Sequence, residues 1–495
     1  MREKKFILPI ILISVMLLIV LALGIMLPSG YGIVCAVCFA CVIALLAFRW
    51  AKLKKTKGNI TLTVVTACVA VLFGCLLYCN PYKGSTTTKL GYVPPMSNPE
   101  QPLTKEQALR DADYAMHYLR KVHPATYGGL PEDVDAQWKK VRSEIAACDS
   151  ISKVELNRKL ESVFSLLGDA HTHLSFNFSD AHYLKYVKSH NEAGDSFVSV
   201  NGIAREDLFY NHRELFSSEC DEYALTFLGH YIVMLEGLEY LGVAPDENGY
   251  TFGVKHEDGT VESISYPVSD FVTYDEYCEY NGIETSQNDD YSFVRYEIDT
   301  DHDLGILTID ECSYNNTYRT TVKKFFAEVK EAGIKNVAVD LRNNGGGSSL
   351  VGNEFIRYLP MEKYKDFASD LRMGFIKVPA PAGEIKNNQD KENQFSGNVY
   401  VITSVRSFSA AMDFAMYIKD NGMGLIVGEA SGNRPDSYGD VVSFRLPESK
   451  LYMQISWKKW YRIDETKAHD FIEPDIPCDA DEALNVLCEH LTQKN

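Results

Sequence analysis

Short apolar runs and amphipathic stretches alternate along the chain from Leu304 onward, and this alternation restricts the folds that it can adopt. The runs are of strand length, and the stretches between them carry apolar residues at helical spacing. We expect strands at 304–309, 336–341, 398–403 and 424–427, and helices at 320–332, 350–359 and 409–421. Two outer strands follow, at 441–446 and 451–457. This order predicts an α/β layer with mostly buried strands.

The first 80 residues differ from the rest of the chain in hydropathy and in charge. Three uncharged apolar stretches are each about as long as a membrane-spanning helix, at 6–27, 31–48 and 60–79. A signal peptide would account for one such stretch, not for three. Lys and Arg cluster at 2–5 and 49–57, which places the N-terminus in the cytoplasm. We therefore expect residues 1–80 to be a multi-pass anchor in the cell membrane, with the later domains extracytoplasmic.

Composition and periodicity divide the remaining chain into four segments. Residues 81–102 are rich in Pro, Ser, Thr and Gly and are expected to form a flexible linker. Residues 103–176 predict a cap of three helices, two of which begin at capping boxes formed by Thr104 with Gln107 and by Ser152 with Glu155. Residues 177–300 are mixed α/β with a hairpin near 250–264, and residues 301–495 hold the α/β core.

Charge and cysteine usage exclude several classes of function. The chain has 495 residues and a net charge of −18, although its first 80 residues are basic. The later part is therefore strongly acidic and offers no basic patch for nucleic acid. Its six scattered cysteines do not form a disulfide framework, and the sequence cannot assign any pairing among them. No zinc-type spacing is present, so we expect no metal and no cofactor.

Ser409 and a glycine run are the residues that suggest chemistry. Ser409 is expected at the start of a helix, where unpaired N–H groups and the helix dipole favour negative charge. Gly345, Gly346 and Gly347 follow a buried strand, without the Gly-Lys-Ser/Thr of a phosphate loop. Either feature alone is also consistent with an ordinary helix cap or turn. Together they predict an oxyanion hole for acyl transfer, with donors at Gly345 or Gly346 and at Ala410 or Ser409 itself.

Five short motifs, in order along the chain, carry a family resemblance. The segment 337–347, which ends in the glycine run, resembles the signature of the tail-specific (C-terminal processing) serine peptidases, a family that includes the tricorn core protease. The other segments that resemble this family lie at 167–172, 403–411, 428–429 and 473–475. The resemblance implies a ClpP/crotonase-like core of repeated β-β-α units with an N-terminal helical cap. No PDZ domain is evident, although many members of the family carry one.

The catalytic base is where this chain departs from the best-known members. They use a lysine 25 positions after the serine, and this chain has Arg434 there, which cannot act as a base. His171 lies in the segment where tricorn-like members carry their catalytic histidine, and a neutral imidazole suits proton abstraction. Glu465 lies in the interval where those members carry a glutamate. Weaker candidates for the base are His173, His469, Lys458 and Lys459.

We therefore expect a membrane-anchored serine endopeptidase that cleaves extracytoplasmic peptides or proteins. Its catalytic residues would be Ser409, His171 and Glu465, with Gly345, Gly346 and Ala410 as oxyanion donors. Three alternatives remain open. The first is a catalytically inactive ligand-binding module of the same fold. The second is a membrane sensor that binds peptides without cutting them. The third is a crotonase-like acyl-CoA enzyme, which an extracytoplasmic location disfavours. The sequence does not indicate the substrate, the cleavage rule or the oligomeric state.

Overall fold

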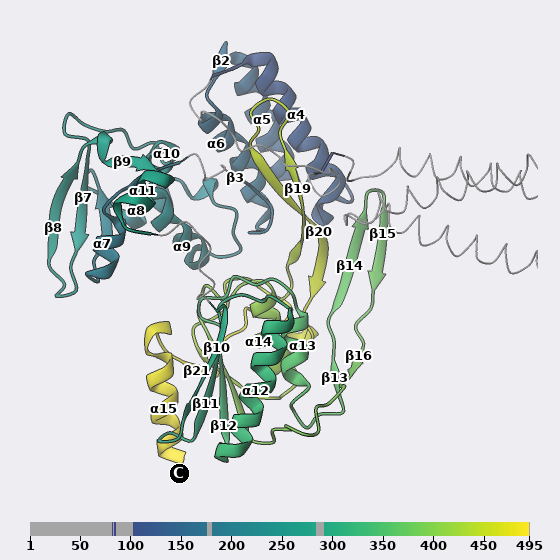
Figure 1. The fold of residues 1–495 in the computed structure, drawn as a ribbon. Coiled ribbons are helices and arrows are strands. Elements are labelled where there is room, and N and C mark those ends of the chain that lie inside the picture. The colour runs from purple at the N-terminus through teal and green to yellow at the C-terminus, as the bar shows by residue number, and fades with distance from the viewer. Residues whose placement is uncertain (1–81, 83, 86–101, 176–180, 284–291, 495) are drawn as a thin grey trace, which may run out of the picture.

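A computed structural model describes residues 82, 84–85, 102–175, 181–283 and 292–494 of the chain (Figure 1). The three membrane helices expected at 6–79, and most of the linker, lie outside these ranges. Within the described ranges, none of the helices has the length and apolar character needed to cross a membrane.

A six-stranded sheet forms the centre of the core, and it confirms the expected mixed α/β architecture. Its strand order is β10-β11-β12-β17-β18-β21, and every neighbouring pair is parallel except β10 with β11. The β-β-α order expected from the resemblance occurs once in this sheet, as β10, β11 and α12. The strands are β10 (Val294–Asp299), β11 (Leu304–Ile309), β12 (Asn336–Asp340), β17 (Asn398–Thr403), β18 (Leu425–Gly428) and β21 (Ile476–Pro477).

Helices cover both faces of this sheet, which explains why its inner strands β11, β12, β17 and β18 are largely apolar. Val337, Val339 and Val401 face α12 (Asn316–Ala332), α13 (Leu350–Ile356) and α14 (Ala410–Asp420). The alternate residues Ala338 and Tyr400 face α15 (Ala483–Lys494). Helix α12 begins earlier than the expected residue 320, because the side chain of Asn315 caps it by accepting the Tyr318 N–H.

The three helices expected before residue 176 are present. They are α4 (Lys105–Val122), α5 (Glu132–Ala147) and α6 (Lys153–Phe164). Thr104 and Gln107 form the full capping box in front of α4. Ser152 accepts the Glu155 N–H, but only this half of the second expected capping box is formed. The short strands β1 (Leu103–Thr104) and β2 (Ser150–Ile151) pair beside these helices.

A long antiparallel ribbon connects the core with the helical cap (Figure 1). Its strands are β19 (Tyr438–Arg445) and β20 (Tyr452–Tyr461), of which β19 begins earlier and β20 ends later than expected. The tip packs Val442, Phe444 and Met453 into the apolar cluster of the cap. Its backbone N–H groups at Glu448 and Ser449 donate to the buried carboxylate of Asp111 on α4, at 2.8 and 2.7 Å.

Further strands extend the sheet of this ribbon. Strand β3 (His173–Ser175) pairs with one part of β20, and β14 (Ala368–Met373) with another. Strand β15 (Ile376–Ala380) completes the order β15-β14-β20-β19. A separate pair is formed by β13 (Lys363–Lys365) and β16 (Glu384–Lys386).

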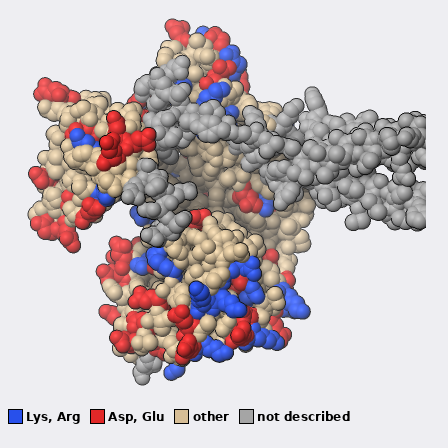
Figure 2. Space-filling view, in the orientation of Figure 1, with Lys and Arg blue, Asp and Glu red and all other residues tan. Residues whose placement is uncertain are grey.

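The segment between the cap and the core forms a small α/β insert around the four-stranded sheet β6-β5-β7-β8. The hairpin expected near 250–264 is present as β7 and β8. Figure 2 shows a hollow on the molecular surface between the cap, the insert and the core. The elements are β4 (His182–Leu184), α7 (Val187–Glu192), β5 (Ser196–Val200), β6 (Ile203–Ala204), α8 (Arg205–Asn211), α9 (Asp221–Ile232), α10 (Leu235–Tyr240), β7 (Tyr250–Lys255), β8 (Val261–Tyr266), β9 (Phe271–Thr273) and α11 (Tyr274–Tyr280).

Candidate active site

Ser409 lies at the sharp turn between strand β17 and helix α14. Its backbone angles are φ +55° and ψ −123°, in a region that residues with a side chain rarely occupy. Holding a serine there costs on the order of 1–3 kcal/mol, so the surrounding structure must fix the turn. A strained strand-to-helix turn of this kind is one way in which a protein presents a nucleophilic serine to its substrate.

Asn433 fixes the backbone of this turn. The Ser409 N–H donates to Asn433 Oδ1 at 2.7 Å, and the Asn433 side chain is completely buried. Asn433 Nδ2 in turn donates to the Arg434 carbonyl at 3.1 Å. The expectation that the Ser409 N–H could serve the oxyanion hole is therefore wrong for this structure, because Asn433 occupies that donor. Sequence reasoning missed Asn433, because nothing in its local pattern distinguishes it from a loop asparagine.

The glycine run lies directly against Ser409. Gly346 has φ +104°, and a Cβ atom added to it would lie 2.6 Å from Ser409 Cβ and 2.8 Å from the Phe408 carbonyl oxygen. No side chain fits at such distances, so only glycine allows this approach. Gly347 has φ +136° and is equally close to the Cys312 carbonyl oxygen. The close approach of the glycine run to Ser409 had been expected from sequence, and the structure contains it.

The expected oxyanion donors differ in their availability. The Gly346 N–H donates to Asn344 Oδ1 at 2.8 Å, because the asparagine side chain folds back over its own turn. That amide is therefore not free, in contrast to the expectation from sequence. Among the described residues, no hydrogen bond is made by the N–H of Gly345 or of Ala410. Ala410 N also lies 3.0 Å from the position of a Gly346 Cβ, at the N-terminus of α14.

His171 is brought next to the nucleophile loop by the end of the helical cap. The centroid of its imidazole ring lies 4.5 Å from that of Phe408, the residue before Ser409. Both ring nitrogens are buried and make no hydrogen bond to a described residue. No hydrogen bond joins His171 to Ser409 Oγ in the described part of the chain. The structure thus places the His171 ring against Phe408, but not in the geometry of proton transfer from Ser409.

Asp169 is the carboxylate that accompanies His171. Its Oδ1 lies 3.5 Å from His171 Nδ1, and the His171 backbone N–H donates to it at 3.0 Å. The Asp169 carboxylate also accepts from His123 Nε2 at 3.1 Å and from Thr172 Oγ1 at 2.6 Å. Burial by itself would raise the pKa of Asp169, but His123 and His171 hold that pKa well below its usual range. Asp169 is therefore an ionised group beside the imidazole.

Glu465, the third catalytic residue expected from the resemblance, lies elsewhere. It begins the short 3-10 turn η7 (Glu465–Lys467) and is exposed, without a described contact to Ser409 or His171. Asp169 occupies the place beside the imidazole instead. A signal for Asp169 was available, because an acidic residue two positions before a histidine at a helix end can turn back onto it.

The insert also contributes to the site, which sequence reasoning did not foresee. Phe408 lies between His171 and the ring of Tyr223 on α9, whose centroid is 4.5 Å away at an interplanar angle of 4°. Just before α9, Glu219 Oε2 accepts the Arg434 N–H at 2.6 Å. Burial raises the pKa of Glu219 to about 8, so this carboxyl group is largely neutral at pH 7.

The basic residues near the site have other partners. The Arg434 guanidinium lies over the ring of Phe471, 4.8 Å from its centroid. Lys458 forms an ion pair with Asp440, and Lys459 lies 3.8 Å from Asp436. Neither lysine makes a described hydrogen bond to Ser409. His469 is exposed, and His173 Nδ1 lies 3.0 Å from the Ala170 carbonyl oxygen.

The described residues include one group with metal-binding side chains, away from Ser409. Ligand atoms of Asp299, His302 and Cys488 lie within 4.8 Å of one another, at the β10–β11 turn and on α15. His302 Nδ1 lies 2.6 Å from Asp299 Oδ2, so these two side chains already bond to each other.

A protein-family comparison assigns the core. Residues 303–478 match the model described as Peptidase family S41. The chain carries an S41 peptidase domain. This domain includes the glycine run, Ser409 and Asn433, whereas His171, Asp169 and Tyr223 come from segments before it. The chain is thereby assigned to the serine-type peptidases, as the resemblance had implied.

Solved structures of mature CPAF share the fold of the S41 domain together with its flanking segments. A structure of mature CPAF complexed with lactacystin is 15% identical, covers 79% of this chain and 97% of its own, and has a TM-score of 0.55. A second structure of mature CPAF is 14% identical, covers 79% and 96%, and has a TM-score of 0.55. The photosystem II D1 C-terminal processing protease is 14% identical, covers 79% and 98%, and has a TM-score of 0.43. A search of curated proteins found no match.

Proposed function

We propose that this S41 peptidase is an endopeptidase in which Ser409 is the nucleophile, His171 the general base and Asp169 the residue that orients the base. The observation that carries the proposal is the strained Ser409 turn, held by Asn433 and closely packed against Gly346. A serine that only caps a helix needs neither the strain nor the adjoining glycine. Stored strain of this kind is concentrated at functional sites.

The proposed reaction follows acyl transfer to serine. Ser409 Oγ attacks the scissile carbonyl carbon while His171 takes its proton, and the imidazolium then protonates the leaving amine. Water, deprotonated by His171, hydrolyses the acyl-enzyme and releases the second product. The ionised Asp169 stabilises the imidazolium and fixes the orientation of its ring. The free N–H groups of Ala410 and Gly345 are the proposed donors to the oxyanion. His171 must approach Ser409 Oγ when substrate binds, because catalytic hydrogen bonds often tighten only then.

The test compares wild type with Ser409→Ala and His171→Gln, using hydrolysis of fluorescently labelled casein and reaction with a fluorophosphonate probe. Ser409→Ala should abolish both signals, because it removes the acylated oxygen. His171→Gln should lower the rate of labelling by a factor on the order of 10³ while leaving the thermal midpoint nearly unchanged. Casein hydrolysis that persists in Ser409→Ala at the wild-type rate would rule out this serine as the nucleophile.

We also propose that the peptidase is anchored in the cell membrane by residues 1–80, with its N-terminus in the cytoplasm. The support is the length of the three apolar stretches and the clustering of Lys and Arg at 2–5 and 49–57. Its substrates would then be extracytoplasmic peptides or proteins. Trypsin added to intact cells should digest the domains after residue 102. If the chain is degraded only after cell lysis, the proposed orientation is wrong.

A peptide-binding module without catalysis is the second candidate function. Two observations favour it: Arg434 occupies the position of the usual lysine, and the His171 imidazole makes no hydrogen bond to Ser409. This candidate predicts that casein binds without being hydrolysed and that the fluorophosphonate probe leaves Ser409 unmodified.

A further inference from the structure

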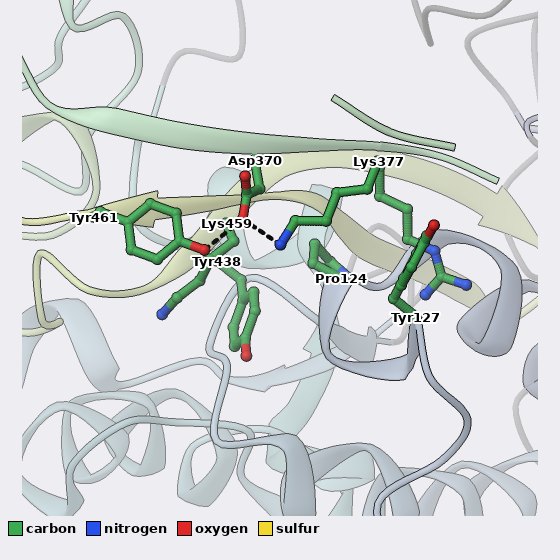
Figure 3. A pocket seen from close by; sticks show the side chains of 8 residues that line it. Pro124, Tyr127, Asp370, Lys377, Tyr438, Lys459 and Tyr461 are labelled. Carbon is green, nitrogen blue, oxygen red and sulfur yellow. Dashed lines mark hydrogen bonds and ion pairs between the residues drawn. The ribbon is translucent and has the colours of Figure 1, made fainter. Parts of the chain in front are cut away.

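A pocket of about 210 Å³ lies between the helical cap and the sheet β15-β14-β20-β19 (Figure 3). Its cap side is the short turn η2 (Pro124–Thr126) and the residue after it, Tyr127. Its sheet side carries four charged residues, together with the aromatic rings of Tyr438 and Tyr461. The pocket therefore combines apolar walls with a small number of convergent polar groups, as ligand sites commonly do.

Two of the charged residues that line the pocket neutralise each other. Lys377 Nζ lies 2.6 Å from Asp370 Oδ2, and the Tyr461 hydroxyl donates to the same carboxylate (Figure 3). The third, Arg372, is buried, and its donors bind Gly374 O, Arg120 O, Thr126 Oγ1 and the carbonyl oxygen of His123. Four of the five N–H donors of Arg372 are therefore used within the protein, and its guanidinium contributes a positive charge to the pocket.

The fourth, Lys459, has donors to spare. Its ion pair with Asp436 is 3.8 Å long, which exceeds hydrogen-bonding distance, and its ammonium lies 4.7 Å from the centroid of the Tyr438 ring. The side chain is only 19% exposed, so water has limited access to it. An ammonium group carries three donors, and a partly desolvated one gains most from an anion placed beside it.

The pocket is connected to the candidate active site through the β19–β20 ribbon. Tyr438 pairs with Lys459 across the ribbon, and its ring lies 4.6 Å from that of His123. His123 in turn bonds to Asp169, the carboxylate beside His171. Gly439, the next residue of β19, would place a Cβ atom 4.0 Å from the His171 ring. The strand that lines the pocket thus also passes close to the His171 ring.

We propose that this pocket binds a carboxylate group of a peptide, with the ammonium of Lys459 as its counter-ion. The charges of Lys377 and Asp370 cancel, and Asp436 offsets one of the two remaining cations, so the site matches a monoanion better than a doubly charged phosphate. The carboxylate comes from the C-terminus of the peptide or from an Asp or Glu side chain. The assignment of this peptide as a substrate rests on the proposed function, whereas carboxylate binding itself does not.

The experiment measures peptide binding by calorimetry to the Ser409→Ala protein, which cannot turn the peptide over. Three Ala/Gly octapeptides, all N-acetylated, serve as probes: one with a free C-terminal carboxylate, one amidated, and one amidated with a single Glu. At least one of the two carboxylate peptides should bind ten-fold or more tightly than the neutral one, and the tighter of the two identifies the source. Lys459→Met in the same protein should abolish this preference.

The control is Lys458→Met, which removes a neighbouring cation that does not line the pocket. This variant should keep the preference for carboxylate peptides. Lys459→Arg retains the positive charge and should also keep the preference for carboxylate peptides. This variant keeps the test valid even if Lys459→Met folds poorly. Equal affinity for all three peptides, no detectable binding, or a preference unchanged by Lys459→Met would each overturn the proposal. Casein hydrolysis by the wild type is measured separately. Carboxylate binding without hydrolysis would refute the proposed function but would still support carboxylate binding in this pocket.

Discussion

At the scale of single residues, Asp169 lies at the centre of the hydrogen bonds around His171. It joins the end of the helical cap to the imidazole and to His123, and its low pKa keeps it ionised. Sequence analysis named His171 and Ser409 as catalytic candidates, because each stands in a short motif that can be recognised locally, and the structure places the His171 ring against the residue before Ser409. It assigned the third role to Glu465 from the family resemblance, because the position of Asp169 two residues before His171 suggests the contact with the imidazole but does not fix the packing that forms it.

Asp169→Asn is predicted to lower kcat by a factor on the order of 10³–10⁴ with little change in KM, because the amide neither stabilises the imidazolium nor fixes the productive tautomer. Steady-state hydrolysis of casein measures this effect. Asp149→Asn, at an exposed position outside the site, is the matched control. A kcat within two-fold of wild type would remove Asp169 from the mechanism.

Substitution by alanine should have opposite outcomes at the neighbouring glycines Gly345 and Gly346. Gly346→Ala puts a methyl group 2.6 Å from Ser409 Cβ at a positive φ, so it should abolish activity and destabilise the fold by roughly 1–3 kcal/mol. Gly345→Ala meets no atom within 4 Å and retains its N–H, so it should fold normally and keep most activity. Urea unfolding and casein hydrolysis test both variants. Equal stability of the two would contradict the tight packing at Ser409.

At the scale of elements, the central sheet could be predicted and the connecting strands could not. Strands β11, β12, β17 and β18 are continuous apolar runs between amphipathic helices, and such runs are visible in the sequence. Nothing was predicted between residues 359 and 398, where β13 to β16 lie. Strand β14 pairs with β20, about ninety positions later, so its formation depends on a partner that local pattern does not reveal.

The segment before helix α9 predicts a pH effect on stability. The pKa of Glu219 is about 8 in the folded protein and about 4.3 in an unfolded chain, so the folded state holds a proton that the unfolded state releases between these values. Stability from this group is fully present below pH 4 and declines as the pH rises toward 8.

Glu219→Gln removes this titration, so the free energy of unfolding should fall less from pH 5 to pH 8 in the variant than in wild type. Urea titrations at the two pH values measure the difference. Arg434, Asp169 and Lys459 also face Glu219, and all three are unchanged in the variant. Parallel pH profiles for the two proteins would show that Glu219 is ionised in the fold.

At the scale of the whole molecule, three units meet at one site. The core supplies Ser409, the cap supplies His171 and Asp169, and the insert supplies Tyr223. The sequence indicated the first two units through their motifs. It predicted the insert as a mixed α/β segment but not its part in the site, because the contact of Tyr223 with Phe408 joins residues that no shared pattern connects.

Tyr223→Leu should lower kcat/KM for casein by about ten-fold, because it removes the ring that stacks on Phe408 beside His171. The global cost should be near 1 kcal/mol, the usual worth of an aromatic pair. Phe227→Leu, one turn later on α9, removes an exposed ring that contacts Tyr223 and has no described contact with Phe408, and it should leave activity unchanged. If both variants lose activity equally, the effect arises from the helix as a whole and not from the stack on Phe408.

The wide sequence separation of these contacts also has a consequence for the newly made chain. The contact of Asp111 with the ribbon tip joins residues 338 positions apart, and the ribbon follows Ser409 in the sequence. Contacts between residues so far apart in the sequence form late, after most of the polypeptide has been synthesised. A chain still being synthesised therefore has His171 and Ser409 on segments that have not yet met. We expect peptidase activity only once the cap, the ribbon and the core have folded together.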